Sequence, residues 1–373
     1  MSTNSIPAVL HLVDTLDLGG TERVAVNLAN HTPRGRYRAY LCSARRAGPL
    51  ASTLREGVPH FNLKRRFRFD LAAVTRLRRF IRQENIQLLH VHASSLFLGR
   101  LVSLLSDPGR VHVIWHDHYG RCEWNDRPTQ LYRLAVMGAA GVIAVNHRLV
   151  DWARQELRVP AQRVWYVPNF VLPVEAKAKP LQELPGSEGS RIVCVANLRP
   201  QKDHLTLIRA MAVVCRKHPE AHLLLIGAAI DEPYARSLHQ TVIDRHLEKN
   251  ITFLGQLREA ATVLPACDVG VLSSASEGLP LSLLEYGWAG IPAIATSVGQ
   301  CPEVLDHGRA GILVEPASPE PLAAAIQFLL DSVEQRRESG RRLRQFVRKT
   351  FDPGAVMEQI CRIYALVLSE GVR

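Results

Sequence analysis

Short apolar runs alternate with longer stretches of helical periodicity along all 373 residues of this chain. This alternation is typical of parallel β-sheets whose successive strands are joined by helices. The first half of the chain contains expected strands at 8–14, 37–43, 88–93, 111–116, 141–146 and 164–168. The second half contains them at 191–196, 222–227, 251–255, 269–273, 292–296 and 311–314. Each set predicts one doubly wound α/β sheet.

The length of the chain also indicates two domains, because one hydrophobic core usually stops growing at about 250–300 residues. The stretch 171–190 is rich in Pro, Lys, Glu and Gly and has no clear period, so it is the expected linker. We therefore predict one domain at 1–170, a second at 191–350, and a C-terminal helical segment at 351–373.

Composition excludes several classes of protein. With 47% hydrophobic and 22% charged residues, the chain is globular rather than disordered or fibrous. No apolar run approaches the roughly 20 residues of a membrane-spanning helix, and the N-terminus does not resemble a secretory signal, so we expect a cytoplasmic protein. The seven cysteines are scattered and lack a Cys-x-x-Cys pair, which predicts reduced thiols without disulfides or a zinc site.

Positive charge is concentrated in the first half of the chain. Residues 1–170 contain 24 Lys and Arg against 12 Asp and Glu, a net charge of +12, whereas residues 171–373 contain 22 against 23. Lys64, Arg65 and Arg66 begin a basic and aromatic run that is followed by a basic helix. Such a surface suits the anionic face of a membrane. A solvated face and a nucleic-acid surface are the alternatives, although no nucleic-acid-binding module is present.

Two glutamates eight residues apart carry the clearest functional signal. Glu277 follows a strand and a small polar loop, and Glu285 lies in the helix expected to begin at Pro280. The free N–H groups and the dipole of a helix start favour a pyrophosphate, and the two carboxylates would accept hydrogen bonds from sugar hydroxyls on either side of it. Solvated surface acids are the alternative explanation. The expected phosphate-binding turn comprises Gly278, Leu279, Pro280, Leu281 and Ser282.

The residues around this pair extend the pattern. The segments 273–280, 288–295 and 298–304 together closely resemble the signature of the retaining glycosyltransferases of family four. The resemblance implies the GT-B fold, in which two Rossmann-like, doubly wound parallel-sheet domains face across a cleft. It also implies a nucleoside diphosphate sugar as donor, with Glu277 at the transferred sugar and Glu285 at the ribose. Neither a metal ion, a bound cofactor nor a protein nucleophile is expected.

The first strand is followed by Gly19 and Gly20, directly before a helix. Paired glycines permit positive φ and a close approach of the backbone to phosphate, although a simple tight turn explains them equally well. In the family that this chain resembles, a Gly-Gly loop here reaches toward the donor diphosphate. The sequence lacks Gly-x-Gly-x-x-Gly, which argues against a nicotinamide cofactor.

In the second half, Lys202 resembles the family lysine that neutralises the leaving diphosphate. Many family members carry an arginine five residues earlier, where this chain has Asn197. Arg199 is the candidate for that missing cation, and we include Asn197 and Arg199 among the expected donor-binding residues. A turn residue and a surface charge are the alternative explanations for Lys202 and Arg199.

Histidines gather at the ends of two expected strands, in the pairs His90 and His92, and His116 and His118. His116 resembles the family histidine that reaches the 6-position of the transferred sugar, and His118 is the alternative alignment. Asp117 lies between them and is expected to fix the tautomer of one ring. Metal binding is an alternative, but packed or hydrogen-bonded imidazoles explain the pattern without it.

These observations predict a retaining glycosyltransferase of cell-surface polysaccharide biosynthesis. The predicted catalytic residues are His116, Lys202 and Glu277, and the predicted acceptor site comprises His118, Lys64, Arg65 and Arg66. The expected partners are a nucleotide sugar, a glycan or lipid-linked acceptor and an anionic membrane surface, but not nucleic acid. The protein is expected in the cytoplasm or at the inner face of the membrane. A sugar-nucleotide epimerase and a non-catalytic nucleotide-sugar-binding scaffold are the alternatives.

Overall fold

The chain folds into two compact units in the computed structural model, which describes residues 6–68, 70–106, 111–121, 123, 126–172, 184–257 and 260–370. Unit 1 comprises Met1–Tyr119, Asp126–Phe170 and Pro353–Arg373, and unit 2 comprises Gly120–Asn125 and Val171–Asp352. The predicted first domain at 1–170 therefore differs from unit 1, because six residues after the fifth strand group with unit 2. Of the predicted linker, residues 173–183 lie outside the described part of the chain.

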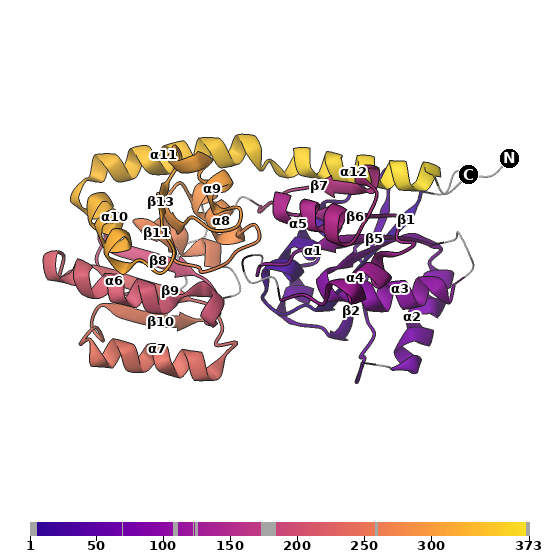
Figure 1. Ribbon diagram of the computed structural model, residues 1–373, viewed down its shortest axis with the longest axis horizontal. Coiled ribbons are helices and arrows are strands. Elements are labelled where there is room, and N and C mark those ends of the chain that lie inside the picture. The colour runs from indigo at the N-terminus through magenta and orange to yellow at the C-terminus, as the bar shows by residue number, and fades with distance from the viewer. Residues whose placement is uncertain are drawn as a thin grey trace. The chain divides into compact units, whose positions relative to one another are not determined.

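Unit 1 is built on a seven-stranded parallel sheet in the order β3-β2-β1-β4-β5-β6-β7 (Figure 1). Its central strands are buried, which explains their nearly continuous apolar sequences. The strands are β1 (Ala8–Thr15), β2 (Arg38–Arg46), β3 (His60–Asn62), β4 (Ile86–His92), β5 (His112–Asp117), β6 (Gly141–Ala144) and β7 (Val164–Tyr166).

Helices connect these strands, and several begin at side-chain caps. Asp70 accepts a hydrogen bond from the backbone N–H of Ala73 at the start of α2, and Asn146 caps α5 in the same way. The helices of unit 1 are α1 (Gly20–His31), α2 (Leu71–Gln83), α3 (Leu96–Leu104), α4 (Thr129–Val136), α5 (His147–Asp151) and α12 (Pro353–Glu370).

Helix α12 belongs to unit 1 although it follows unit 2 in the sequence. The hydroxyl of its fully buried Tyr364 lies 2.6 Å from Nδ1 of His90 on β4. Glu358 forms an ion pair with Arg36 at 2.7 Å, and the side chain of Gln359 donates to the carbonyl of Tyr166. Both ends of the chain therefore contribute to the same hydrophobic core.

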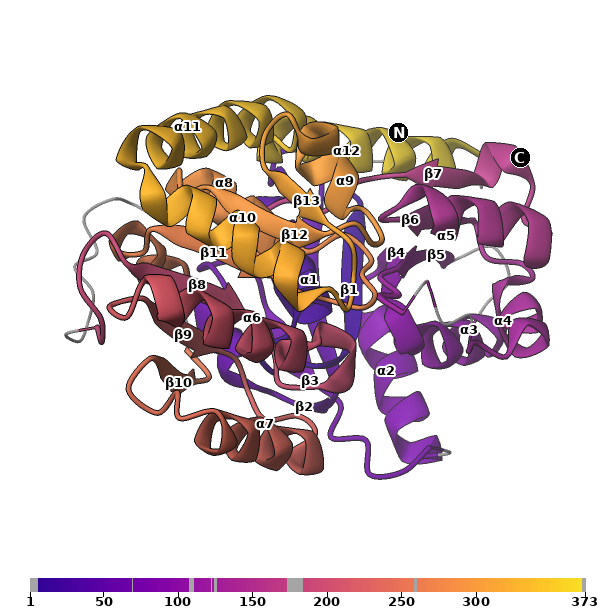
Figure 2. The same ribbon diagram turned by 60° about the vertical axis from the view of Figure 1, so that its left-hand side comes forward.

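Unit 2 contains a six-stranded parallel sheet in the order β10-β9-β8-β11-β12-β13. Helix α6 packs against α7 and α10, and α8 packs against α11 (Figure 2). The strands are β8 (Arg191–Val195), β9 (His222–Ile226), β10 (Ile251–Gly255), β11 (Val269–Leu272), β12 (Ala293–Thr296) and β13 (Ile312–Val314). The helices are α6 (His204–Lys217), α7 (Glu232–Asp244), α8 (Leu281–Ala289), α9 (Cys301–Val304), α10 (Pro319–Asp331) and α11 (Val333–Thr350).

The predicted fold class is confirmed, because each unit is a doubly wound parallel sheet covered by helices. All twelve expected strands are present, with ends that differ by three residues at most. The sequence pattern missed β3, which has only three residues at the sheet edge and no run of apolar positions. In the described part of the chain, no helix combines the length and apolar character that crossing a membrane requires.

Candidate functional site

In unit 2, an ion pair joins the loops that follow β8 and β11. The ammonium Nζ of Lys202 lies 2.5 Å from Oε1 of Glu277, and the hydroxyl of Ser274 donates to the same oxygen at 2.5 Å. The Lys202 and Glu277 side chains are only 12% and 5% exposed. The structure thus brings together two residues that the sequence analysis assigned separately to the diphosphate and to the transferred sugar.

A network of hydrogen bonds fixes these two loops against each other. The hydroxyl of Ser273 donates to the carbonyl of Lys202 at 3.2 Å. The carbonyl of Gln201 accepts from the N–H of Ala275 at 2.9 Å, and the Gln201 side-chain amide donates to the carbonyl of Ser276 at 2.8 Å. Because backbone and side-chain hydrogen bonds hold both loops together, the ion pair is preorganised.

Gly299, in the loop after β12, allows that loop to pack closely against the backbone of Glu277. Its φ of +53° lies in the left-handed region, and a Cβ added there would come within 2.2 Å of the carbonyl oxygen of Glu277. The next residue, Gln300, donates its N–H to the carbonyl of Gly278 at 2.9 Å. A residue larger than glycine at 299 would displace the backbone that carries the Glu277 carboxylate.

Helix α8 begins directly after this carboxylate. It starts at Leu281, so Pro280 is its N-cap rather than its first residue as expected, and no side chain caps the helix. The N–H groups of the first turn and the helix dipole therefore favour an anion at this end. Glu285 lies one turn further along and is partly exposed. The buried turn before the helix comprises Gly278, Leu279 and Pro280, and Ser282 is buried within the first turn.

The other expected donor-binding residues occupy the loop after β8. The side-chain oxygen of Asn197 accepts from the backbone N–H of Ala228 at 2.9 Å, so it holds the neighbouring loop. Arg199 is exposed and precedes the short 3₁₀ turn Pro200–Lys202. The donor-binding roles of Asn197 and Arg199 stay predictions.

Glu123, which the sequence analysis did not single out, reaches the same loops from the segment that groups with unit 2. Its Oε1 accepts from the N–H of Gly299 at 2.8 Å, and its Oε2 is hydrogen-bonded to the hydroxyl of Ser276. The Glu123 carboxylate therefore accepts hydrogen bonds from two donors close to Glu277, the N–H of Gly299 and the hydroxyl of Ser276. The only signal in the sequence was an acid in a polar stretch after a strand.

In unit 1, four buried histidines on the strands and the partly buried His118 directly after β5 form one group. We call His11, His90, His92, His116 and His118 the histidine cluster. Their ring nitrogens contact one another at 3.0 Å between His90 Nε2 and His116 Nδ1, 3.0 Å between His92 Nδ1 and His118 Nε2, and 3.2 Å between His11 Nδ1 and His92 Nε2. The structure thus brings both predicted sugar-site histidines, His116 and His118, into one group with three others.

Burial keeps these imidazoles neutral at physiological pH. Desolvation lowers the pKa of His11 and of His118 to about 3, and the pKa of His116 lies well below its usual value for the same reason. Nε2 of His116 is buried without a hydrogen-bond partner among the described residues. A neutral ring can either donate or accept at that atom, depending on its tautomer.

Asp117 does not hold a histidine ring as expected, because Arg127 binds its carboxylate. Two guanidinium nitrogens of Arg127 lie 2.7–2.9 Å from the two oxygens, and both side chains are more than nine-tenths buried. The guanidinium also lies over four aromatic rings, which strengthens its fit in a buried site. These rings are those of Trp115, Tyr119, Tyr132 and Trp152, at 3.6–5.5 Å.

Gly19 and Gly20 follow β1, but neither has a positive φ. Gly19 has φ −128° and ψ 162° and precedes α1, which begins at Gly20. A Cβ at Gly19 would lie 2.2 Å from a carboxylate oxygen of Glu22. That oxygen ends a flexible side chain and can move aside, so this contact does not require a glycine. The two glycines do not adopt the positive φ that they permit, and their donor-binding role stays a prediction.

The basic run that was expected to bind the acceptor follows β3. Lys64 and Arg66 are exposed, whereas Arg65 is partly buried and its guanidinium lies 3.7 Å from Asp14. The run continues into Phe67, which is 64% exposed. Arg65 therefore has an acidic partner that the sequence did not predict.

Comparisons with known proteins agree with this architecture. A family model described as glycosyl transferases group 1 matches residues 178–346, and one described as glycosyltransferase family 4 matches residues 18–173. The chain belongs to glycosyltransferase family 4.

This glycosyltransferase is 29% identical over 314 residues to N-acetyl-alpha-D-glucosaminyl L-malate synthase of Bacillus anthracis, covering 81% of this chain and 80% of that relative. It is 24% identical over 369 residues to the phosphatidyl-myo-inositol mannosyltransferase of Mycolicibacterium smegmatis, covering 98% and 90% of the two chains. The crystal structure of Anabaena HepE in complex with UDP and glucose shares the fold, with a TM-score of 0.80 at 20% identity over 96% of this chain and 99% of that one.

The glycosyltransferase also contains three site residues that sequence reasoning missed. Arg127 and Glu123 lie in a polar stretch after β5 that has no helical or strand period. Gly299 was noted only as part of a motif, because its positive φ and its contact with Glu277 depend on how two distant loops meet. The burial of Arg127 could not be predicted from the sequence, because it depends on the pairing with Asp117.

Proposed function

We propose that this glycosyltransferase moves a sugar, with retention of configuration, from a nucleoside diphosphate sugar to a glycan or lipid-linked acceptor of cell-surface polysaccharide biosynthesis. The observation that carries the proposal is the buried ion pair of Lys202 with Glu277 beside the uncapped start of α8. This arrangement places a cation, a hydrogen-bond acceptor for hydroxyls and an anion-favouring helix end within one set of braced loops.

Lys202 stabilises the leaving diphosphate in this proposal. An ammonium has three N–H donors, and Glu277 takes one of them, which leaves two for phosphate oxygens. As the bond between the sugar and the phosphate breaks, negative charge grows on the phosphate, and a cation already held in place stabilises that charge without reorganising. Glu277 holds the ammonium in position and accepts from a hydroxyl of the transferred sugar.

The remaining donor contacts follow from the same loops. The first turn of α8 binds a phosphate through its N–H groups, and Glu285 binds the ribose hydroxyls. From unit 1, we propose that His116 orients the sugar through Nε2. The acceptor hydroxyl attacks on the face that the diphosphate leaves, and the phosphate takes its proton, so that neither a protein nucleophile nor a metal ion is needed. HepE, a structural relative, was crystallised with UDP and glucose, which favours UDP as the first nucleotide to test.

The acceptor is proposed to lie at an anionic membrane surface. Phe67 and Leu71 are 64% and 73% exposed, and the cations Lys64, Arg66 and Arg79 in the same stretch of sequence are exposed as well. Further exposed apolar residues occur on α3 and α4 and at the residue after each helix, namely Leu101, Leu104, Leu105, Leu131, Leu134 and Met137. A segment that exposes both apolar and cationic side chains suits insertion among anionic headgroups. The named relatives include an N-acetyl-alpha-D-glucosaminyl L-malate synthase and a phosphatidyl-myo-inositol mannosyltransferase, so small and lipid-linked acceptors require a direct test.

A thermal-shift screen against nucleoside diphosphates and their sugars tests the donor assignment, with Glu285→Ala as the ribose-site variant. A ligand at 100 times its Kd stabilises by about 2.7 kcal/mol. We expect one base series to stabilise the parent protein and not the variant. No response to any nucleotide would favour a scaffold, and consumption of the donor without an acceptor would favour an epimerase.

Vesicle sedimentation tests the membrane proposal separately. We expect the protein to bind vesicles containing phosphatidylglycerol but not vesicles of phosphatidylcholine alone. A Phe67→Ser, Leu71→Ser double variant should lose this binding while nucleotide binding in unit 2 is unchanged. Equal binding of parent and variant at physiological salt would contradict the membrane surface proposed here.

A further inference from the structure

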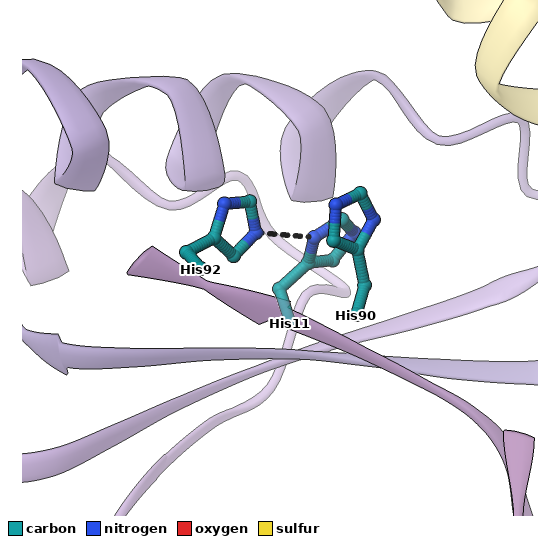
Figure 3. A group of neighbouring side chains, drawn as sticks. All are labelled: His11, His90 and His92. Carbon is teal, nitrogen blue, oxygen red and sulfur yellow. Dashed lines mark hydrogen bonds between the residues drawn. The ribbon is translucent and has the colours of Figure 1, made fainter. Parts of the chain in front are cut away.

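Most histidines of the histidine cluster have no role in the proposed transfer reaction. Only His116 has a role in that reaction, yet His11, His90 and His92 are as deeply buried, with 0%, 0% and 1% of their surface exposed. Figure 3 shows these three rings on the same side of the strands, with His90 and His92 on β4 and His11 on neighbouring β1. The register explains this placement, because His11 pairs directly with His90.

The protein alone does not satisfy the ring nitrogens of the cluster. Among the described residues, His11 Nε2, His116 Nε2 and His118 Nδ1 are buried without a hydrogen-bond partner. A neutral imidazole has one N–H, so the row from His11 through His92 to His118 must end in an unpaired N–H on one side and an unpaired lone pair on the other. Each such buried group costs about 1–3 kcal/mol. The two buried nitrogens without a partner at the ends of this row, His11 Nε2 and His118 Nδ1, favour a bound ligand at the cluster.

The donor set identifies the chemistry of that ligand. One nitrogen from each of His11, His90 and His92 lies within 4.8 Å of the others, and neither a carboxylate nor a thiolate belongs to this set in the described part of the chain. Imidazole ligands favour Zn²⁺, Cu²⁺ and Ni²⁺, whereas Mg²⁺ and Ca²⁺ prefer oxygen. The 3.2 Å between His11 Nδ1 and His92 Nε2 is close to the roughly 3.4 Å expected between two nitrogens of a tetrahedral zinc site.

The second nitrogens of two of these rings also have suitable partners. Nδ1 of His90 lies 2.6 Å from the hydroxyl of Tyr364, and Nδ1 of His92 lies 3.0 Å from Nε2 of His118. A histidine that binds a metal almost always donates its other N–H to such a partner, which fixes its tautomer and orientation. The Nε2 atoms of both rings face other imidazoles of the cluster, His90 Nε2 at 3.0 Å from His116 Nδ1 and His92 Nε2 at 3.2 Å from His11 Nδ1, and an ion bound by them takes the place of these two contacts.

We propose that unit 1 binds one divalent transition-metal ion of the zinc class through His11, His90 and His92. The ion replaces the hydrogen bond between His11 and His92 and the one between His90 and His116. It also opens the stack of His90 on His92, whose planes are only 3° apart, because lone pairs in parallel stacked rings do not meet at one point. The site belongs to unit 1, whereas the Lys202 and Glu277 loops belong to unit 2, and the ion has no step in the proposed transfer.

Metal analysis of the tag-free protein tests the proposal. The protein is dialysed against Zn²⁺ or Co²⁺, and bound metal is measured by mass spectrometry and by competition with a chromophoric chelator. We expect one ion per chain, a Co²⁺ visible spectrum typical of nitrogen ligands, and a rise in unfolding temperature with Zn²⁺ but not with Mg²⁺. Failure of the parent protein to bind Zn²⁺ would overturn the proposal.

Matched variants locate the ion. His11→Gln and His92→Gln should lose at least a hundredfold in Zn²⁺ affinity, whereas His112→Gln, on the neighbouring strand but outside the cluster, should keep it. Tyr364→Phe should weaken binding by about 10–100-fold. If His11→Gln bound Zn²⁺ with unchanged affinity, the assignment to His11, His90 and His92 would be overturned. That result is also the one expected if His92, His116 and His118 form the site instead. UDP binding, measured in the same variants, tests the proposed donor site independently.

Discussion

Replacing Glu277 by Gln should make the protein less stable and yet leave its affinity for UDP intact or improved. The substitution removes the charge that balances Lys202 while it keeps the shape of the side chain. Losing one partner of a buried pair costs about 3–5 kcal/mol. Lys202 retains 12% exposure, so we expect the low end of that range. Sugar transfer should fall sharply, because the ammonium loses its anchor and the sugar loses a hydrogen-bond acceptor.

The affinity for UDP separates this reasoning from a simple loss of structure. In the Glu277→Gln variant the unbalanced ammonium gains its only anion when UDP binds, so part of the lost stability returns on binding. Each 1.4 kcal/mol regained tightens UDP binding tenfold. Lys202→Met should do the reverse, because losing a charged hydrogen bond of about 1.5–3 kcal/mol weakens binding roughly 10–150-fold.

Calorimetric titration with UDP and urea unfolding of both variants measure these effects. The matched control is Asp331→Asn, which breaks an ion pair with Lys217 of similar length, 2.6 Å, but with side chains 56% and 44% exposed. That loss should cost about 0–1 kcal/mol and leave UDP binding unchanged. If Glu277→Gln weakened UDP binding as much as Lys202→Met does, the assignment of the cation to the diphosphate and of the carboxylate to the sugar would be refuted.

Three further predictions concern other residues. Gly299→Ala should lower the free energy of unfolding by about 1–3 kcal/mol and reduce the rate of sugar transfer, because the new Cβ clashes with Glu277. Gly35→Ala, whose Cβ would have open space around it, should change neither quantity. Urea unfolding and initial rates of transfer measure both effects. Burial lowers the pKa of His204 to about 4, so below pH 6.5 the unfolded state binds more protons than the folded state. The free energy of unfolding should therefore fall by up to about 1.4 kcal/mol for each pH unit between pH 6.5 and pH 4. His204→Leu should remove this contribution, and an unchanged pH dependence in the variant would contradict the prediction. Arg127→Met should destabilise unit 1 by about 3–5 kcal/mol by leaving the buried Asp117 unpaired, and the Arg127→Met, Asp117→Asn double variant should recover part of the loss in thermal unfolding.

The sequence predicted the sheets better than the contacts at the candidate site. A strand buried on both faces leaves an apolar run of fixed length, which is why β1 and β8 were predicted to within one residue at each end. Strand β3 has three partly buried residues and leaves no such trace. The contact between Lys202 and Glu277 spans 75 positions, and it depends on hydrogen bonds between two loops that no local pattern encodes.

The histidines illustrate the same limit. Alternation along β4 placed His90 and His92 on one face, and the sequence also placed His116 and His118 at a strand end. The sequence did not indicate His11, because this residue joins the histidine cluster only when β1 lies beside β4 in the sheet. Asp117 was assigned to a histidine because the two are adjacent in sequence, whereas in the structure the more distant Arg127 offers two charged donors and lies among aromatic rings.

The return of α12 to unit 1 sets an order on folding during protein synthesis. The chain leaves unit 1 at Phe170 and supplies its last helix only from Pro353 onward. At about 5–20 residues per second, the ribosome needs roughly 10–40 seconds to make the intervening segment. At the end of that time unit 2 has all of its own residues, whereas unit 1 still lacks the helix that carries Tyr364. Unit 2 should therefore finish folding first, and nascent unit 1 should be the part that chaperones protect.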